Sequence, residues 1–474
     1  MSLDISKLTI ETAHVGLMIG DFKSQDLVQA YIDEIKKTNS DLNAYLEVFD
    51  DAMAKAIEVD EKIARKEEVS ILAGIPFGIK DNILIKGKLC SAGSKILGNY
   101  HATYDATVIE KLKSKDVIFL GRTNMDEFAM GGSTENSAYG PTKNPHDLSR
   151  VPGGSSGGSA AVVGANLALA SLGSDTGGSI RQPASFCGVV GLKPTYGAVS
   201  RYGLMAMASS LDQIGPITKT VEDAEIIFNA IKGQDDLDAT SAKIPVYPQE
   251  EDANLRKRKI GIPKSLLSEG VDDVVLENFY QSVHKFRDYG YEIVSVDLSL
   301  LKYSLACYYV LMPAEVSSNL ARFDGMRYGN RVSGDNLLED YLKTRGEGFG
   351  PEVRRRIMLG TYVLSAGYYD SYYNKANDVR NLIRSAYEKV FEEVEVILTP
   401  TAPSPAWKIG EKIDDPLQMY LGDIFTVPAN LAGLPAISIP SGETAEGLPL
   451  GIQITAPHFR EDLLFSFGKH FTKL

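Results

Sequence analysis

The sequence predicts an α/β protein. Segments with helical periodicity alternate with short apolar segments typical of strands, and no internal repeat with a period between 20 and 50 residues interrupts this alternation. Among the 474 residues, 44% are hydrophobic and 23% are charged, as in an average globular protein, which argues against a disordered chain. Because no apolar run approaches the ~18 residues of a transmembrane helix, the sequence also argues against a membrane-spanning protein.

The first part of the chain predicts helices followed by a strand. Residues 1–70 carry apolar side chains near helical spacing, namely Leu27, Tyr31, Ile35 and Leu42. The period changes to alternation within residues 71–85, which suits a strand. Lys80 and Asp81 would face opposite sides of that strand, so we do not expect them to form an ion pair.

Three short elements are expected next. Asp105 is expected to cap a helix that reaches Lys115, and residues 117–120 are expected to form a short buried strand that ends at Gly121. Further along, residues 160–170 predict a helix of small apolar residues. This helix is too hydrophobic to be exposed to solvent, so we expect it to be buried.

The second half of the chain continues the alternation. Residues 221–231 predict a helix, and the polar stretch 233–259 is expected to be a surface excursion. Residues 272–289 predict an amphipathic helix that stops at Gly290, with inward positions at Val275, Phe279, Val283 and Phe286. Helices are expected over most of residues 304–390. The remaining strands are predicted at residues 291–298, 394–398, 436–439 and 450–455.

Charge and cysteine content limit the possible functions. The chain has 49 Lys and Arg against 62 Asp and Glu, a net charge of −13, which is opposite to that of a protein that binds nucleic acid on its own. The basic run at residues 256–259 follows acidic residues, so a solvated loop is favoured over an RNA contact. Cys90, Cys187 and Cys307 are far apart, which argues against a disulfide framework. No secretory leader is visible at the start, and we expect a cytoplasmic protein.

Glycine is the one residue in excess. A typical content of ~7% predicts about 33 glycines, whereas the chain has 43, and 16 of them fall within the 83 residues 121–203. Two turns rich in glycine and serine lie there, at residues 150–159 and 173–183. Because the first turn runs directly into the apolar helix 160–170, we expect it to be buried, with its backbone close to another group, rather than to be a flexible linker.

The first turn also fits the G-x-S-x-G pattern of a nucleophile elbow, at residues 153–157. The elbow requires a preceding strand and a later histidine, but residues 143–152 have loop chemistry, and His284, His458 and His470 are poorly placed partners. A serine hydrolase without histidine could use a lysine that burial keeps neutral. Lys80 has the most apolar neighbourhood of any lysine, although a buried structural lysine paired with a carboxylate is an equal alternative.

The two turns resemble the amidase signature. The likeness covers residues 153–161 and 175–183, and Lys80 precedes Ser155 by 75 residues, as that family places its lysine. The resemblance implies one amidase signature domain over residues 1–474, with a large central mixed β-sheet covered by helices on both faces. The helical segment 1–70 and the excursion 233–259 would then be elaborations of that domain.

The resemblance also implies the catalytic roles. The family's nucleophile corresponds to Ser179, its bridging serine to Ser155 and its base to Lys80, a Ser-Ser-Lys triad. In the family the bridging serine follows a cis peptide bond, which here is Gly154–Ser155. The oxyanion hole would consist of backbone N–H groups, at Thr176, Gly177, Gly178 and Ser179.

Further stretches resemble the glutamine-hydrolysing subunits of tRNA-dependent amidotransferases within that family; they are residues 317–325, 355–361 and 423–435. An arginine and an acid would bind the α-carboxylate and the α-ammonium of glutamine. The corresponding positions are Arg356 and Asp423, with Tyr309 as an aromatic contact and Gly131 and Gly132 lining the pocket. Two assignments stay open, because Arg354 and Arg355 adjoin the arginine and Tyr308 adjoins the tyrosine.

The function implied by this resemblance is glutamine hydrolysis that supplies ammonia for converting Glu-tRNA(Gln), Asp-tRNA(Asn) or both. Such an enzyme is a carbon–nitrogen ligase with glutamine as amido donor. The partners implied are the B and C subunits of an amidotransferase heterotrimer, with tRNA bound mainly by the B subunit, which also uses ATP and Mg. We expect no cofactor and no metal in this chain, which has no Walker A motif.

There are two alternatives, one an enzyme of the same family and one a protein of a different class. A free-standing amidase of the same family would act on another small amide, for which the pair Arg356 and Asp423 would be unnecessary. A catalytically inactive scaffold or RNA-binding protein is disfavoured because Lys80, Ser155 and Ser179 are all present and the net charge is −13.

Overall fold

A mixed β-sheet forms the centre of the computed structural model, which describes residues 3–245, 258–267, 270–413 and 415–473. In these residues the strand order is β1-β3-β2-β4-β6-β5-β10-β11-β9-β7-β8. The strands are β1 (Tyr45–Val48), β2 (Pro76–Lys80), β3 (Ile118–Thr123), β4 (Ala170–Asp175), β5 (Val190–Lys193), β6 (Gln213–Thr218), β7 (Lys259–Ile262), β8 (Glu292–Ser295), β9 (Val396–Pro400), β10 (Ala436–Glu443) and β11 (Pro449–Thr455). β2 is parallel to both of its neighbours, β3 and β4, whereas the pairs from β4 through β6, β5, β10 and β11 to β9 are antiparallel. The predicted α/β class and the mixed sheet are therefore confirmed.

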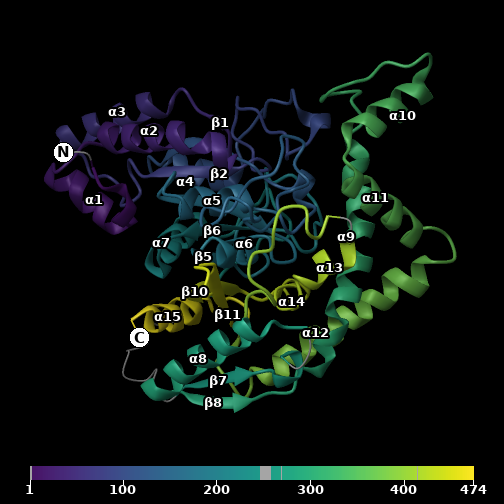
Figure 1. Ribbon diagram of the computed structural model, residues 1–474. Coiled ribbons are helices and arrows are strands. Elements are labelled where there is room, and N and C mark those ends of the chain that lie inside the picture. Colours follow the sequence, from purple (N-terminus) through teal and green to yellow (C-terminus); the bar gives the residue numbers. More distant parts are fainter. Residues whose placement is uncertain (1–2, 246–257, 268–269, 414, 474) are drawn as a thin grey trace.

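Helices pack on both faces of the sheet (Figure 1). The helices of the first half are α1 (Ile10–Ile19), α2 (Ser24–Leu42), α3 (Ala52–Ala64), α4 (Thr107–Lys113), α5 (Gly157–Gly164), α6 (Arg181–Phe186) and α7 (Val221–Ile231). Those of the second half are α8 (Asp273–Tyr289), α9 (Ser304–Asn319), α10 (Leu337–Gly348), α11 (Pro351–Val363), α12 (Lys375–Val390), α13 (Pro416–Leu421), α14 (Val427–Ala432) and α15 (Glu461–Thr472). Helices α5 and α6 pack together against the sheet, and α7 packs with α4 and α15. In Figure 1, α9 to α12 form a column along one side of the molecule, opposite α1 to α3.

Several predicted elements are confirmed. The helix predicted at 221–231 is α7, and α8 ends at Gly290, which adopts a left-handed conformation with a φ of 109°. The four predicted inward positions of α8 are all buried. Leu27, Tyr31 and Ile35 are buried on α2, as their spacing predicted.

Other boundaries were wrong for local reasons. The segment 1–70 contains the strand β1, because Asn43 ends α2 in a left-handed conformation and Tyr45 then pairs with Thr123 of β3. Within 71–85 only five residues form a strand, and all five are buried. β3 passes through Gly121 instead of ending there. The helix predicted at 160–170 spans residues 157–164, and β4 begins at its expected end.

Asp105 does not cap the following helix. α4 begins after Ala106, and the Asp105 carboxylate instead accepts a hydrogen bond from the Lys86 N–H at 2.8 Å and pairs with Lys113 at 2.7 Å. The strand predicted at 291–298 is also shorter, since β8 covers 292–295.

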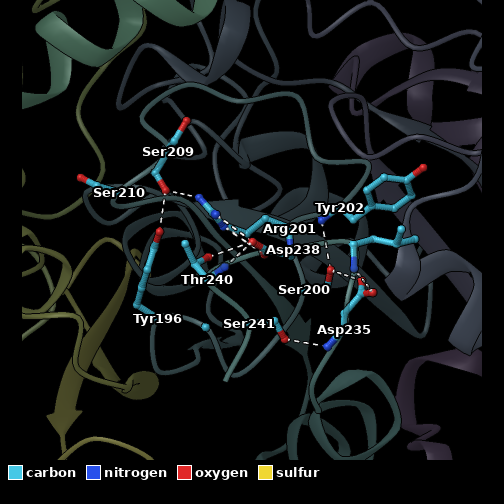
Figure 2. A network of polar contacts seen from close by, with 12 residues as sticks. Tyr196, Ser200, Arg201, Tyr202, Ser209, Ser210, Asp235, Asp238, Thr240 and Ser241 are labelled. Atoms are coloured by element: carbon cyan, nitrogen blue, oxygen red, sulfur yellow. Dashed lines mark hydrogen bonds and ion pairs between the residues drawn. The ribbon is translucent and has the colours of Figure 1, made fainter. Parts of the chain in front are cut away.

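A polar network holds the described start of the 233–259 stretch to the loop after β5 (Figure 2). Arg201 donates to Asp238 through Nη2 at 2.9 Å and Nε at 3.2 Å, and Asp235 accepts from the Ser200 hydroxyl at 2.5 Å. This arginine holds the pKa of Asp238 at about 2, although partial burial alone would raise it. Residues 246–257 lie outside the described residues, and so does part of the basic run 256–259.

No helix among the described residues is both long enough and apolar enough to cross a membrane. The three cysteines are all buried and unpaired.

Candidate active site

Lys80, the last residue of β2, is fully buried beside four polar atoms of three serines. Its Nζ lies 2.8 Å from Ser155 Oγ and 2.7 Å from Ser156 Oγ. Ser174 contributes both its Oγ, at 2.9 Å, and its carbonyl oxygen, at 3.2 Å. Burial lowers the pKa of Lys80 to about 7, although three nearby carboxylates partly oppose the shift. No ion pair of Lys80 occurs among the described residues, so the alternative of a lysine paired with a carboxylate is not found.

The sheet brings the two glycine-rich turns together. β2 and β4 are parallel neighbours, so Lys80 and the turn after β4 lie at the same edge of the sheet. The turns touch directly, because the Ser156 N–H donates to the Ser179 carbonyl oxygen at 3.1 Å. The Gly154–Ser155 peptide is cis. Ser155 is 0% exposed whereas Ser179 is 8% exposed, so of these two serines Ser179 has the access to solvent that a substrate would need.

The carboxylate of Asp175 shapes the turn that carries Ser179. It accepts hydrogen bonds from the N–H groups of Gly178 at 2.8 Å and Ile180 at 3.1 Å. It also forms a buried two-atom ion pair with Arg181, with both N–O distances at 3.0 Å. Although burial alone would raise the pKa of Asp175, this arginine and the other hydrogen-bond donors hold it well below its usual range.

The N–H of Gly178 is not available to a substrate. The Gly177 carbonyl accepts from Thr426 Oγ1 at 2.7 Å. Because the two dipoles of a trans peptide point in opposite directions, the Gly178 N–H is directed the other way, toward Asp175. The expectation that Gly178 contributes to an oxyanion hole is therefore corrected. In the part of the chain that the structure describes, the N–H groups of Thr176, Gly177 and Ser179 have no hydrogen-bond acceptor.

Arg356 is the buried member of the arginine run. It is 4% exposed, on α11, whereas Arg354 and Arg355 are exposed. Its Nε donates to Glu352 Oε1 at 2.7 Å, and its guanidinium lies 5.4 Å from the ring centroid of Tyr420. The structure thus separates Arg356 from its two neighbours, which the sequence could not do.

Asp423 lies between α13 and α14, close to Arg356. Burial raises the pKa of Asp423 to about 7, while Arg356 and a hydrogen bond from Tyr309 partly oppose the shift. Tyr309 also stacks on Tyr420, with ring centroids 3.9 Å apart. Its neighbour Tyr308 packs instead against the turn that carries Ser179, since a Cβ on Gly177 would lie 2.7 Å from its hydroxyl. Tyr309 is therefore the tyrosine on the side of the arginine and the acid.

Gly131 and Gly132 lie against Asp126 and Gln182. A Cβ on Gly131 would overlap the Asp126 carboxylate, and the Gly132 carbonyl accepts from Gln182 Nε2 at 2.9 Å. A Cβ on Gly132 would lie 3.9 Å from Met419. A cavity of about 640 Å³ lies beside Met419, and its lining includes Glu352, Arg354, Arg355 and Tyr420. The lining does not include the expected substrate-binding residues Gly131, Gly132, Tyr309, Arg356 and Asp423.

Comparison with known proteins identifies the family. The model of the amidase family matches residues 26–465. The chain belongs to the amidase signature family. The match includes both glycine-rich turns and Lys80, and it extends through Arg356 and Asp423.

Members of this family resemble the chain over its whole length. The A subunit of glutamyl-tRNA(Gln) amidotransferase from Desulfatibacillum aliphaticivorans is 51% identical over 472 residues, covering 99% of this chain and 97% of the relative. The protein of the same name from Koribacter versatilis (strain Ellin345) is 52% identical, covering 97% of this chain and 96% of the relative. The crystal structure of the A subunit of glutamyl-tRNA(Gln) amidotransferase from Thermotoga maritima has a TM-score of 0.81 and 44% identity, covering 98% of this chain and 94% of that chain.

The structure adds residues to the amidase signature site that the sequence did not single out. They are Ser156, Ser174, Thr426, Glu352, Tyr420, Thr134 and Gln182. Most act on partners far away in the sequence, so spacing gave no signal for them. Among the described residues, no group of three or more His, Cys, Asp or Glu side chains could hold a metal ion.

Proposed function

We propose that this chain is the glutamine-hydrolysing subunit of a tRNA-dependent amidotransferase, with Ser179 as nucleophile, Ser155 as proton bridge and Lys80 as base. The observation that carries the proposal is the buried Lys80, which has no carboxylate partner among the described residues and lies 2.8 Å from Ser155 Oγ. The names of the relatives that match the full chain support the same function.

The serines around Lys80 favour one orientation of its neutral amine. Ser156 Oγ donates its proton to the Ser174 carbonyl at 3.0 Å, so toward Lys80 it can only accept an N–H. The Ser174 side chain, which also contacts Asn82 Nδ2 at 3.0 Å, accepts the second N–H. A neutral amine has two N–H groups and one lone pair. The lone pair is then left for the hydroxyl proton of Ser155.

Catalysis follows from this arrangement. Ser155 passes its proton to Lys80 and takes the proton of Ser179, whose Oγ attacks the side-chain amide carbon of glutamine. The N–H groups of Thr176, Gly177 and Ser179 stabilise the oxyanion. The proton returns through Ser155 to the leaving nitrogen, ammonia departs, and water then releases glutamate from the acyl-enzyme.

Two charged groups support selection of glutamine. Arg356 would bind the α-carboxylate and Asp423 the α-ammonium, with Tyr309 between them and Gly131 and Gly132 lining the pocket. A simple amide has neither charge, so this pair favours glutamine hydrolysis over a free-standing amidase that acts on an uncharged substrate.

The rest of the complex is proposed from the names of the relatives and from the charge. We infer that the ammonia passes to a partner, the B subunit, which holds tRNA, ATP and Mg, and that a third chain, the C subunit, completes a heterotrimer in the cytoplasm. The net charge of −13 supports a partner that supplies most of the tRNA-binding surface.

Substitution Ser179→Ala tests the proposal. We expect ammonia release from glutamine to disappear while the circular dichroism spectrum is unchanged, and the exposed Ser114→Ala serves as the matched control. The unsubstituted protein should prefer glutamine over asparagine and simple amides, with and without the partner subunits. Persistent ammonia release by Ser179→Ala would contradict the assignment of Ser179 as the nucleophile. Absence of a preference for glutamine would favour the free-standing amidase.

A further inference from the structure

Thr134 has an unusual backbone conformation beside the active site. It is completely buried and has a φ of +61°, although β-branched residues rarely adopt this left-handed region. Asp126 stabilises the conformation, since its Oδ2 accepts the Thr134 N–H at 2.9 Å and its Oδ1 accepts the Asn136 N–H at 3.1 Å. A strained residue that is held so firmly suggests a function for its side chain.

The hydroxyl of Thr134 spans the turn that carries Ser155. Oγ1 donates to the Gly153 carbonyl at 2.7 Å and accepts from the Gly157 N–H at 3.1 Å. These two glycines lie two residues before and two residues after Ser155. A Cβ on Gly157 would overlap Thr134 Oγ1, so the contact requires glycine at this position.

Gln182 holds the same turn from α6. Its Oε1 accepts the Gly154 N–H at 2.9 Å, and its Nε2 donates to the Gly132 carbonyl at 2.9 Å. The Ser155 carbonyl accepts from the Asp126 N–H at 3.2 Å. Together with Thr134, these contacts bind backbone groups of the turn on both sides of Ser155 to residues outside it.

We propose that Thr134 and Gln182 are positioning residues for the proton relay, an inference that rests on the function proposed above. A turn rich in glycine has many accessible conformations, yet Ser155 must hold its Oγ between Lys80 and Ser179 while a proton moves in each direction. Thr134 and Gln182 hold the turn in the conformation in which Ser155 Oγ lies 2.8 Å from Lys80 Nζ.

The chemistry of the leaving group makes this role measurable. When the C–N bond of glutamine breaks, Ser155 must deliver a proton to the nitrogen so that ammonia leaves, with Lys80 replacing the proton on Ser155. An activated ester releases a stable phenolate without that proton. Displacement of Ser155 should therefore slow hydrolysis of an amide more than hydrolysis of an activated ester at the same site.

Substitution Thr134→Val tests the role, because it replaces the hydroxyl by a methyl group of similar size. We expect kcat for glutamine to fall at least tenfold with KM within twofold, and the ratio of glutamine to glutamate γ-p-nitrophenyl ester turnover to fall at least threefold. Thr134→Ser should recover most of both values. Thr218→Val is the matched control, since Thr218 is equally buried and its hydroxyl donates to Thr220 O at 2.8 Å, at the end of β6 far from Ser179.

Several results would overturn the inference. One is an unchanged kcat for glutamine in folded Thr134→Val. Another is an equal loss of turnover for the amide and the ester in Thr134→Val that is not recovered in Thr134→Ser. If Thr134→Val does not fold, Gln182→Ala decides in its place, and an unchanged amide-to-ester ratio in that variant counts against the proposal. If Ser179→Ala is inactive while the Thr134 and Gln182 variants behave like the unsubstituted protein, only the positioning role fails and the proposed function stands.

Discussion

The pH dependence of glutamine hydrolysis should reveal two groups that both must lose a proton. In the roles proposed above, Lys80 would act as a base only when neutral, and Asp423 would bind an ammonium only when ionised. Both groups have a pKa of about 7 in the free protein, Lys80 because burial lowers it and Asp423 because burial raises it. At pH 6 about one-tenth of each group is in its active form, and at pH 8 about nine-tenths is.

The product of the two fractions sets kcat/KM, which reports the free enzyme. We expect kcat/KM to fall about 100-fold from pH 8 to pH 6. In the complex with glutamine, the bound ammonium keeps Asp423 ionised, so kcat depends on Lys80 alone and should fall about tenfold over the same range.

Steady-state ammonia release measured between pH 5.5 and 8.5 tests this expectation, with Asp423→Asn as the diagnostic variant. We expect that variant to have a much higher KM, but its kcat/KM should fall only about tenfold from pH 8 to pH 6, because one of the two titrations is removed. A kcat that does not change over this range would refute the role of Lys80 as base. An unchanged 100-fold fall in Asp423→Asn would refute the role of Asp423.

Two further substitutions test the proposed glutamine contacts and the turn that carries Ser179. Arg356→Gln should raise KM for glutamine about 10- to 100-fold through loss of a charge-assisted contact, whereas the exposed Arg354→Gln should leave KM within twofold in the same assay; equal effects would contradict the assignment. Gly178→Ala should lower the free energy of unfolding in urea by about 1–3 kcal/mol, because Gly178 has a φ of +136° and a Cβ there would overlap Thr426 Oγ1. Gly346→Ala lies on α10, where the added Cβ would meet no other described part of the chain within 4 Å beyond its own helix backbone and chain neighbours. It should raise the free energy of unfolding by about 0.5–1 kcal/mol. A loss of stability equal to that of Gly178→Ala would show that the turn imposes no special constraint.

The fold class followed from the sequence because periodicity is a local property. α7 and α8 have one apolar face each, so their spacing predicted them closely. β2 is buried on both faces, so the alternation of apolar residues within 71–85 did not indicate where the strand begins and ends. β1 is a short edge strand after a long helix, and its pairing with β3 depends on residues more than 70 positions away.

The sequence predicted only those residues of the candidate site that belong to recognisable motifs. The amidase signature indicated Lys80, Ser155 and Ser179, whose roles stay predictions, while no spacing rule indicated that Thr134 and Gln182 bind the turn around Ser155. One correction could have been made from the sequence. An aspartate in a turn often accepts a backbone N–H two or three residues further on, and Asp175 does so with Gly178.

The proposed relay and the side chains proposed to bind glutamine come from different stretches of the chain. The relay belongs to residues 80–179, at the ends of β2 and β4, whereas Tyr309, Arg356 and Asp423 lie on α9, α11 and the turn after α13. Direct contacts nevertheless join the two stretches, because Thr426 Oγ1 donates to the Gly177 carbonyl at 2.7 Å and Tyr308 packs against Gly177. A substitution that shifts α9 or the start of α14 would therefore also shift the turn that carries Ser179.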